Sequence, residues 1–178
     1  MRRLSVIFVL FSALAVPVAA LAATVTPGDG SLVVKNGSAP GGAALGATPV
    51  VVLQITGSVI GQVGPYGKLV IDAGPNADPT AVPQVTGAGW PSDSKRSATA
   101  QVWTGNSVNS FKFRAVGGTY TVLVYGPGVN LVAVGTGTVR LAGFPDTPNG
   151  DGRYSLNGDD FASLPGTQTD KRAIVSNG

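Results

Sequence analysis

Few side chains of this chain could carry acid–base, nucleophilic or metal chemistry. The 178 residues include no Cys, no His and no Glu, so all nine acidic residues are Asp. Disulfides, thiolate metal sites and Ser-His-Asp or Cys-His constellations are therefore excluded within this sequence. Any catalysis would have to use Asp, Lys, Tyr, Ser or Thr, without the most common general base. We therefore expect a protein that is not an enzyme and that uses no cofactor.

Two arrangements of aspartates resemble acid catalysts. The stretch Leu69–Gly74, which contains Asp72, resembles the loop of aspartic proteases, but Ala73 replaces its hydroxyl residue and no second copy follows. A protease dyad needs two carboxylates that share a proton. Asp159 and Asp160 are adjacent, and neighbouring side chains of an extended chain point in opposite directions. Both arrangements are better interpreted as turns, and a secreted Asp-dependent hydrolase is kept as an alternative.

The segment 146–152 is rich in oxygen ligands. Asp146, Asn149 and Asp151 could hold a hard cation such as calcium. The calcium-loop pattern fits only in part, because Thr147 stands where its first Asp belongs. We keep these three residues as a weak metal-site hypothesis beside a plain Asn-Gly and Asp-Gly turn.

The two tryptophans are candidates for binding. Alternation along the predicted strand 98–104 places Trp103 on a polar face with Thr99 and Gln101, and Trp90 lies in a predicted loop. Exposed aromatic rings can stack on sugars or pack against a partner. The alternative is that each Trp covers one end of the hydrophobic core.

A pair of cations is the other binding candidate. Lys112 and Arg114 are two residues apart in a predicted strand and therefore share one face. They could contact an anionic glycan, although a solvated face carries such charges by default. Together with Trp90 and Trp103 they predict an extracellular glycan or a cell-wall polymer as the partner.

The first 22 residues predict a secretory signal peptide. Arg2 and Arg3 precede the apolar run Val6–Val16, and Ala20–Ala22 gives the small-x-small pattern of a cleavage site. We expect cleavage after Ala22, a secreted protein, and no membrane span in residues 23–178. Without the two arginines the net charge falls from +3 to +1, so no electrostatic argument for nucleic acid remains.

Residues 23–178 predict a single all-β domain with loose termini. They are rich in Val, Thr and Gly, and Gly and Pro recur too often for long helices. We expect an antiparallel β-sandwich, jelly-roll-like, of about ten short strands. A β-solenoid is the alternative, because several units read Gly, alternating apolar residues, Gly. The strands are expected near residues 31–36, 49–56, 59–63, 68–72, 84–86, 98–104, 110–116, 119–125, 129–134, 138–142 and 153–156.

The region 110–142 gives the most detailed prediction. Gly117, Gly126 and Gly135 lie at a regular spacing, and Gly117-Gly118 is typical of a two-residue type I′ hairpin turn. Loops are expected at 126–128 and 135–137. The hairpin would pair Ala115 with Tyr120, Phe113 with Val122, and Phe111 with Val124, burying all six on one face. Its other face would carry Lys112, Arg114, Thr119 and Thr121.

The stretch FKFRAVGGTYTVLVYGPGVNLVAVGTGTV (111–139), with GSLVVKNG (30–37), SVIGQVG (58–64) and GRYSLNG (152–158), resembles a group of uncharacterised secreted proteins of high-GC Gram-positive bacteria. The resemblance implies secretion and a compact β domain, and it transfers no catalytic residue. We therefore expect a secreted, non-enzymatic β domain that acts as an extracellular or cell-surface binding or structural module. A self-assembling surface subunit is a further alternative, because Val-rich strands protect their edges poorly.

Overall fold

The computed structural model describes residues 29–39, 46–75, 78, 80–87, 89–91, 99–144 and 152–175. The predicted signal peptide and the weak metal site at Asp146, Asn149 and Asp151 lie outside these residues. Within them the chain forms strands and turns and no helix. The strands are β1 (Gly30–Gly37), β2 (Val51–Val63), β3 (Lys68–Asp72), β4 (Gln84–Thr86), β5 (Gly89–Pro91), β6 (Ala100–Thr104), β7 (Phe111–Tyr125), β8 (Val129–Leu141), β9 (Arg153–Leu156), β10 (Ala162–Ser163) and β11 (Arg172–Ile174).

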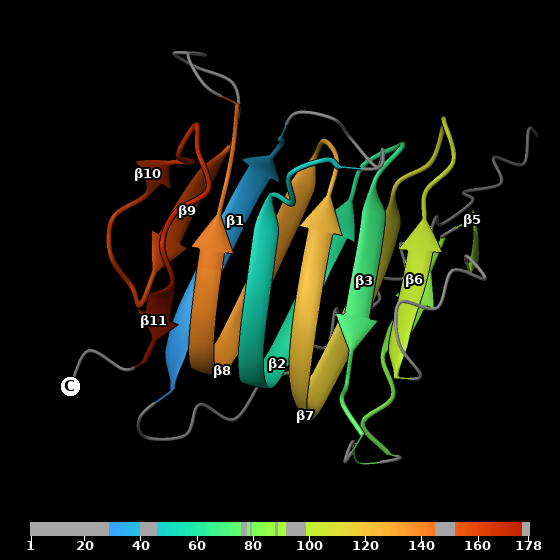
Figure 1. Ribbon diagram of the computed structural model, residues 1–178, viewed down its shortest axis with the longest axis horizontal. Helices are drawn as coiled ribbons and strands as arrows, with labels where there is room; N and C mark the ends of the chain where they lie inside the picture. Colours follow the sequence, from blue (N-terminus) through green and yellow to red (C-terminus); the bar gives the residue numbers. More distant parts are fainter. Residues whose placement is uncertain are drawn as a thin grey trace, which may run out of the picture.

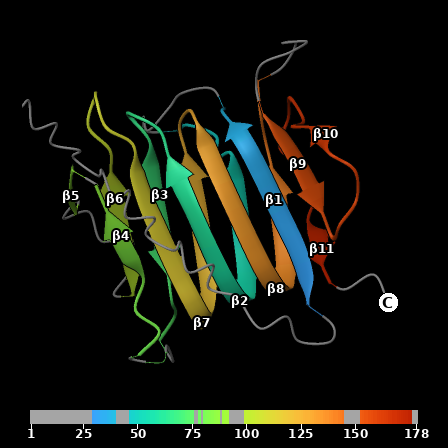
Figure 2. The ribbon, with the colours of Figure 1, turned by 180° about the vertical axis from the view of Figure 1, so that it is seen from behind.

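All strands belong to one antiparallel sheet that is folded over on itself (Figure 1). The strand order is β10-β9-β1-β8-β2-β7-β3-β6-β5, with β11 beside β8 and β4 beside β7. The fold line crosses β2, β7 and β8, so each of these strands runs through both layers. Layer A contains β11, residues 136–141 of β8, 51–56 of β2, 119–125 of β7, β3, β6 and β5. Layer B, in front in Figure 2, contains β10, β9, β1, residues 129–134 of β8, 58–63 of β2, 111–116 of β7 and β4.

Glycines form the fold line between the layers. Gly57 pairs with Gly118 on one side and with Gly135 on the other. A Cβ atom on Gly135 would overlap the carbonyl oxygen of Thr56, and a Cβ on Gly57 would overlap that of Val134. Both residues also have positive φ angles, 150° for Gly57 and 146° for Gly135, which L side chains rarely adopt. Only glycine therefore lets the strands bend this sharply while they stay paired.

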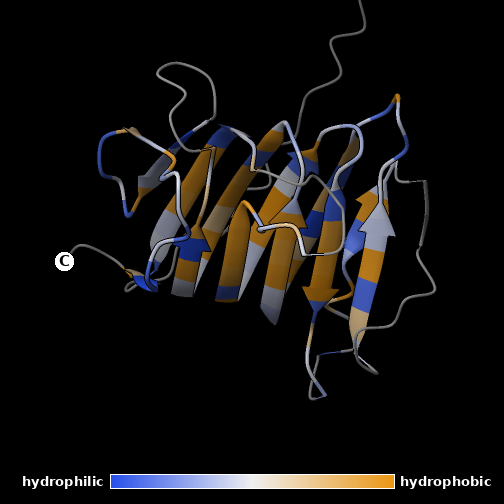
Figure 3. Ribbon diagram, turned by 45° about the horizontal axis from the view of Figure 1, so that its top comes forward, coloured by the Kyte–Doolittle hydropathy of each residue, from blue (hydrophilic) through white to orange (hydrophobic). Residues whose placement is uncertain are grey.

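The hydrophobic core fills the space between the two layers. Figure 3 shows hydrophobic and hydrophilic residues alternating as bands along the long strands, because successive side chains point to opposite faces of a sheet. Most inward residues of both layers are at most 2% exposed. Layer A contributes Leu53, Ile55, Leu69, Ile71, Tyr120, Val122, Val124, Val139, Leu141 and Ile174, and layer B contributes Leu32, Val34, Val59, Val63, Phe111, Phe113, Ala115, Val129, Leu131 and Ala133.

The predicted hairpin at Gly117-Gly118 is wrong. Strand β7 continues through both glycines, so Ala115 pairs with Val59 and Tyr120 pairs with Ile55, both of β2. The six residues predicted to be buried are buried, but they face one another across the core instead of lying side by side in one layer. The polar face is divided as a result: Lys112 and Arg114 lie on the outside of layer B, and Thr119 and Thr121 on the outside of layer A. The predicted loop at 135–137 is likewise part of a continuous β8.

A buried hydroxyl stabilises the bend. The Tyr120 Oη lies 2.9 Å from the carbonyl oxygen of Ala81 and 3.1 Å from that of Val116, and its single proton can be donated to either. Burial raises the pKa of the Tyr120 phenol, and the negative charge of Asp78 raises it further. The hydroxyl thus fastens the segment before β4 to the fold line.

The edges of the sheet are short. Strands β4, β5 and β11 have three residues each, and β10 has two. Short edge strands are one way in which proteins avoid pairing with other copies. The sequence predicted neither β5 nor β10 nor β11, and β11 corrects the expectation of a loose C-terminal end, because residues 172–174 pair with β8.

The predicted fold class is confirmed as an antiparallel all-β sandwich, and the sheet is not a solenoid. Three of its strands are much longer than predicted, at 13 to 15 residues. Among the residues that the structure describes, no helix is long and apolar enough to cross a membrane.

Candidate binding face

The outer face of layer B combines apolar and cationic side chains. Register places Val33 of β1, Val132 of β8, Ile60 of β2 and Arg114 of β7 in one row across four adjacent strands. The first three form an apolar strip in the middle of the layer. Ile60 is 46% exposed and Val132 is 48% exposed. Exposed Ile60 and Val132, with the half-buried Val33 beside them, make a continuous apolar patch on three neighbouring strands, and such patches often mark an interaction site.

The strip forms the floor of a shallow trough of about 400 Å³. Lys35 on β1 and Lys112 on β7 line it at its two sides, and Gln62 and Asn130 line it between them. Since β1 and β7 are three strand spacings apart, these two lysines lie about 14 Å apart at their Cα atoms. The trough is therefore wide enough for an extended chain or a row of sugar rings.

Hydrogen bonds hold the polar side chains of the trough in place. The Asn36 backbone N–H donates to Asn130 Oδ1 at 3.1 Å, and Asn130 Nδ2 donates to the Gly128 carbonyl oxygen at 3.1 Å. Gln62 Nε2 donates to Ser110 Oγ at 3.2 Å. The amide groups are thus oriented before any ligand arrives, which lowers the entropy cost of binding.

The charged side chains on the strands of layer B are all positive. Lys35, Lys112, Arg114 and Arg153 belong to its surrounding strands, and no strand of layer B contains an Asp. Lys35 also places its Nζ 4.4 Å from the centre of the Phe161 ring, a cation–π contact. A low density of negative charge lets the four cations act together on an anionic ligand.

The structure brings together only part of the predicted binding set. Lys112 is exposed and Arg114 is half-buried, and both lie on the outer face of layer B, as their spacing predicted. Sequence reasoning missed Lys35, Ile60 and Val132. Alternation within each strand could have placed these three on the face opposite the core, but only the pairing of β1, β8, β2 and β7 shows that they are neighbours.

Trp103 does not lie on an exposed face, which corrects its choice as a binding residue and agrees with the alternative that it covers part of the hydrophobic core. It pairs with Leu69, packs in the main core and is 9% exposed. The two faces of β6 are reversed relative to the prediction, because Ala100 and Val102 pack on the outside of layer A. Val102 and Trp103 are thus buried on opposite faces of this strand, although Gln101 is exposed, and alternation alone could not place Trp103 in the core. Trp90 lies in β5, of which the structure describes only the backbone.

The described aspartates do not converge on one site. Asp72 ends β3, and its Oδ1 accepts hydrogen bonds from the Gly74 N–H at 2.9 Å and from Thr99 Oγ1 at 2.6 Å. Asp159 and Asp160 are exposed in the turn after β9, and β9 and β3 are separated by four strands of the sheet order. Within the described ranges, no group of three or more acidic residues could hold a metal ion. These aspartates are therefore turn residues, as the sequence indicated.

Comparisons with known proteins found no matching family model, no similar curated protein and no similar solved structure.

Proposed function

We propose that the protein is a secreted, non-enzymatic module that binds an acidic extracellular polymer, such as an anionic glycan or a cell-wall polymer, on the outer face of layer B. The observation that carries this proposal is the trough lined by Lys35 and Lys112, with Arg114 paired to Ile60 and Arg153 paired to Lys35, on strands without acidic residues. The cations would contact the acidic groups of the polymer, and the strip formed by Val33, Ile60 and Val132 would contact the apolar surface of its backbone.

The trough suits a polymer better than a small metabolite. It is open to solvent, and its floor follows the surface of a sheet. Small molecules are usually held in concave sites that bury most of their surface. A polymer instead gains affinity from several weak contacts along the trough.

The test compares binding of an acidic polysaccharide, a polyphosphodiester and neutral dextran by isothermal titration calorimetry at two salt concentrations. We expect binding of at least one acidic polymer, weaker binding at high salt, and no binding of dextran. The variant Lys112→Gln should lower the affinity about tenfold, since a charge-assisted contact contributes about 1.5–3 kcal/mol.

Lys68→Gln is the matched control. It removes the same charge from the outside of layer A, where Lys68 lies over the Tyr125 ring at 4.4 Å. Its affinity should equal that of the wild type. Equal losses of polymer affinity in Lys112→Gln and Lys68→Gln would show that only net charge matters and would contradict a defined site. Tight binding that salt does not weaken would contradict it as well.

The apolar strip has its own test. Ile60→Thr keeps the β-branched shape and the charge but makes the floor polar. Because Ile60 is nearly half exposed, we expect the melting temperature to change little while the affinity falls several-fold. Unchanged affinity in Ile60→Thr would show that the strip takes no part in binding.

A further inference from the structure

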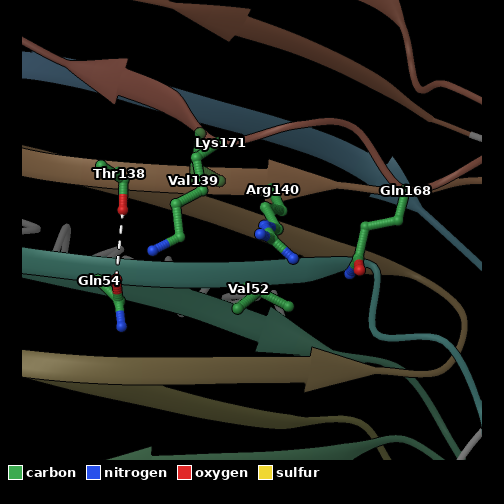
Figure 4. A pocket seen from close by; sticks show the side chains of 7 residues that line it. All are labelled: Val52, Gln54, Thr138, Val139, Arg140, Gln168 and Lys171. Carbon is green, nitrogen blue, oxygen red and sulfur yellow. Dashed lines mark hydrogen bonds between the residues drawn. The ribbon is translucent and has the colours of Figure 1, made fainter.

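A second cationic site lies on the opposite side of the molecule, on the outside of layer A. Figure 4 shows a groove between β2, β8 and the segment that leads into β11. Its volume is about 190 Å³, roughly half that of the trough on layer B. Val52 and Gln54 of β2 and Arg140 of β8 line it together with Gln168 and Lys171.

The groove holds the side chains that recognise a single anionic group. In Figure 4 the side chains of Arg140, Lys171 and Gln168 reach over β2 toward Val52 and Gln54. A guanidinium can bind a carboxylate or phosphate through two parallel hydrogen bonds, an ammonium adds a point charge, and an amide adds a donor. Asp170 adjoins Lys171 in sequence but does not line the groove.

The segment that carries Gln168 and Lys171 is firmly attached to the sheet. The Thr169 backbone N–H donates to the Leu141 carbonyl oxygen at 2.9 Å, and the Leu141 N–H donates to Thr169 Oγ1 at 3.0 Å. Just after Lys171, Arg172 pairs with Val139 in the register of β11 and β8. Contacts at Thr169, between the two residues, and at Arg172, just after them, fix the backbone from which the two side chains project, so the groove is formed before a ligand binds.

We propose that this groove binds a carboxylate or phosphate group of a second polymer chain, so that the protein bridges two acidic polymers through its opposite faces. The bridging rests on the function proposed above, whereas the anion site in the groove stands on its own residues. The core between the layers keeps the two sites apart, and one ligand chain cannot occupy both without passing around an edge of the sandwich.

The first experiment maps the two sites separately. Short uronic acid oligomers, which carry carboxylates, and short glycerol phosphate oligomers, which carry phosphates, are titrated into labelled protein and followed by NMR. We expect two sets of shifted amides, one near Val52, Thr138 and Gln168, and one near Ile60 and Val132. The oligomer that binds more tightly identifies the anionic group. Shifts confined to layer B would overturn the groove site and leave the proposed function intact.

The second experiment uses variants of each face. Arg140→Gln/Lys171→Gln should lose the layer A shifts, bind one oligomer instead of two, and keep the layer B affinity. Lys112→Gln/Arg114→Gln should do the reverse. All four side chains project from the outside of the sheet, so both variants should keep the melting temperature of the wild type within a few degrees.

Bridging is measured by light scattering of long acidic polymers mixed with protein. The wild type should produce scattering that passes through a maximum as protein is added, and each double variant should produce less than a tenth of it. Lys68→Gln, which removes a layer A charge outside the groove, should scatter like the wild type. Full scattering by Arg140→Gln/Lys171→Gln would overturn the bridging. The layer B site would instead be overturned by two results together: Arg140→Gln/Lys171→Gln no longer binds either oligomer, and Lys112→Gln/Arg114→Gln binds and scatters like the wild type.

Discussion

The outer faces of the two layers differ in whether their apolar side chains are covered by other segments of the chain. On layer A, Val70, Val102 and Tyr125 form a second hydrophobic cluster that is covered by the chain itself, with Ala47 from the segment before β2 packed against it. On layer B, Ile60 and Val132 remain about half exposed, and no described segment packs over them.

This difference is informative because the same strands build both faces. Strand β2 places Val52 on one outer face and Ile60 on the other, with the bend at Gly57 between them. The chain therefore covers apolar surface where its own segments can reach it and leaves a strip open where cations surround it. The comparison favours an external partner for layer B, and it leaves layer A with polar residues and one small cationic groove.

The largest expected effect is unfolding, which would abolish binding on both outer faces. Gly135→Val should prevent folding, because a side chain there would overlap the Thr56 carbonyl oxygen in the neighbouring strand and would have to adopt a positive φ. We expect no cooperative thermal transition by circular dichroism and no ligand binding.

Gly74→Val serves as the control for the Gly135 variant. Gly74 also has a positive φ, 73°, but a Cβ there meets no other atom. This variant should be destabilised yet still fold. A folded Gly135→Val protein with both faces active would show that the bend does not depend on glycine.

A smaller effect should separate the stability of the core from ligand binding on the outer faces. Trp103→Ala should lower the free energy of unfolding by about 3–5 kcal/mol, since removing a large aromatic side chain leaves a cavity. Polymer binding to either face should be unchanged below the melting temperature. Denaturant titration measures the first quantity and calorimetry the second. If Trp103→Ala kept the stability of the wild type but bound polymer weakly, Trp103 would be a binding residue and not a core residue.

The smallest expected effect is on the pH dependence of stability, and ligand binding on either outer face should not change. The pKa of the Tyr120 phenol is raised in the folded protein, so the folded state binds its proton more tightly than the unfolded chain. Stability from this group is complete below the normal tyrosine pKa of about 10 and is lost as the pH rises above it. Tyr120→Phe should lower stability by about 1 kcal/mol at neutral pH.

The pH profile distinguishes this role of Tyr120 from simple packing. The wild type should lose stability more steeply than Tyr120→Phe as the pH rises above about 10, as measured by thermal melts at each pH. Parallel profiles for the two proteins would show that the buried hydroxyl does not couple folding to proton binding.

The sequence predicted local features well because alternation and turn residues are local. Strands β3, β4 and β9 have the predicted bounds, and the inward positions of β7 are all buried. It could not distinguish a hairpin from a folded strand at Gly117-Gly118. In both arrangements Ala115 and Tyr120 point to the same apolar space, and only pairing with the distant β2 decides between them.

The candidate site was less predictable for the same reason. Lys112 and Arg114 were found because they are neighbours in one strand. Lys35 and Val132 join them only through the pairing of strands that are distant in sequence, and Trp103 was misplaced because β6 buries residues on both of its faces.

The interleaved strand order also has a consequence for when the chain can fold. Asn36 bonds to Asn130, 94 positions later, and β8 gains its last neighbour only when β11 has been synthesised. Chains dominated by such distant pairings fold slowly, and no early segment here can complete a layer alone. A chain with this order of strands keeps residues 136–141 of β8 without their outer neighbour until residues 172–174 have been made.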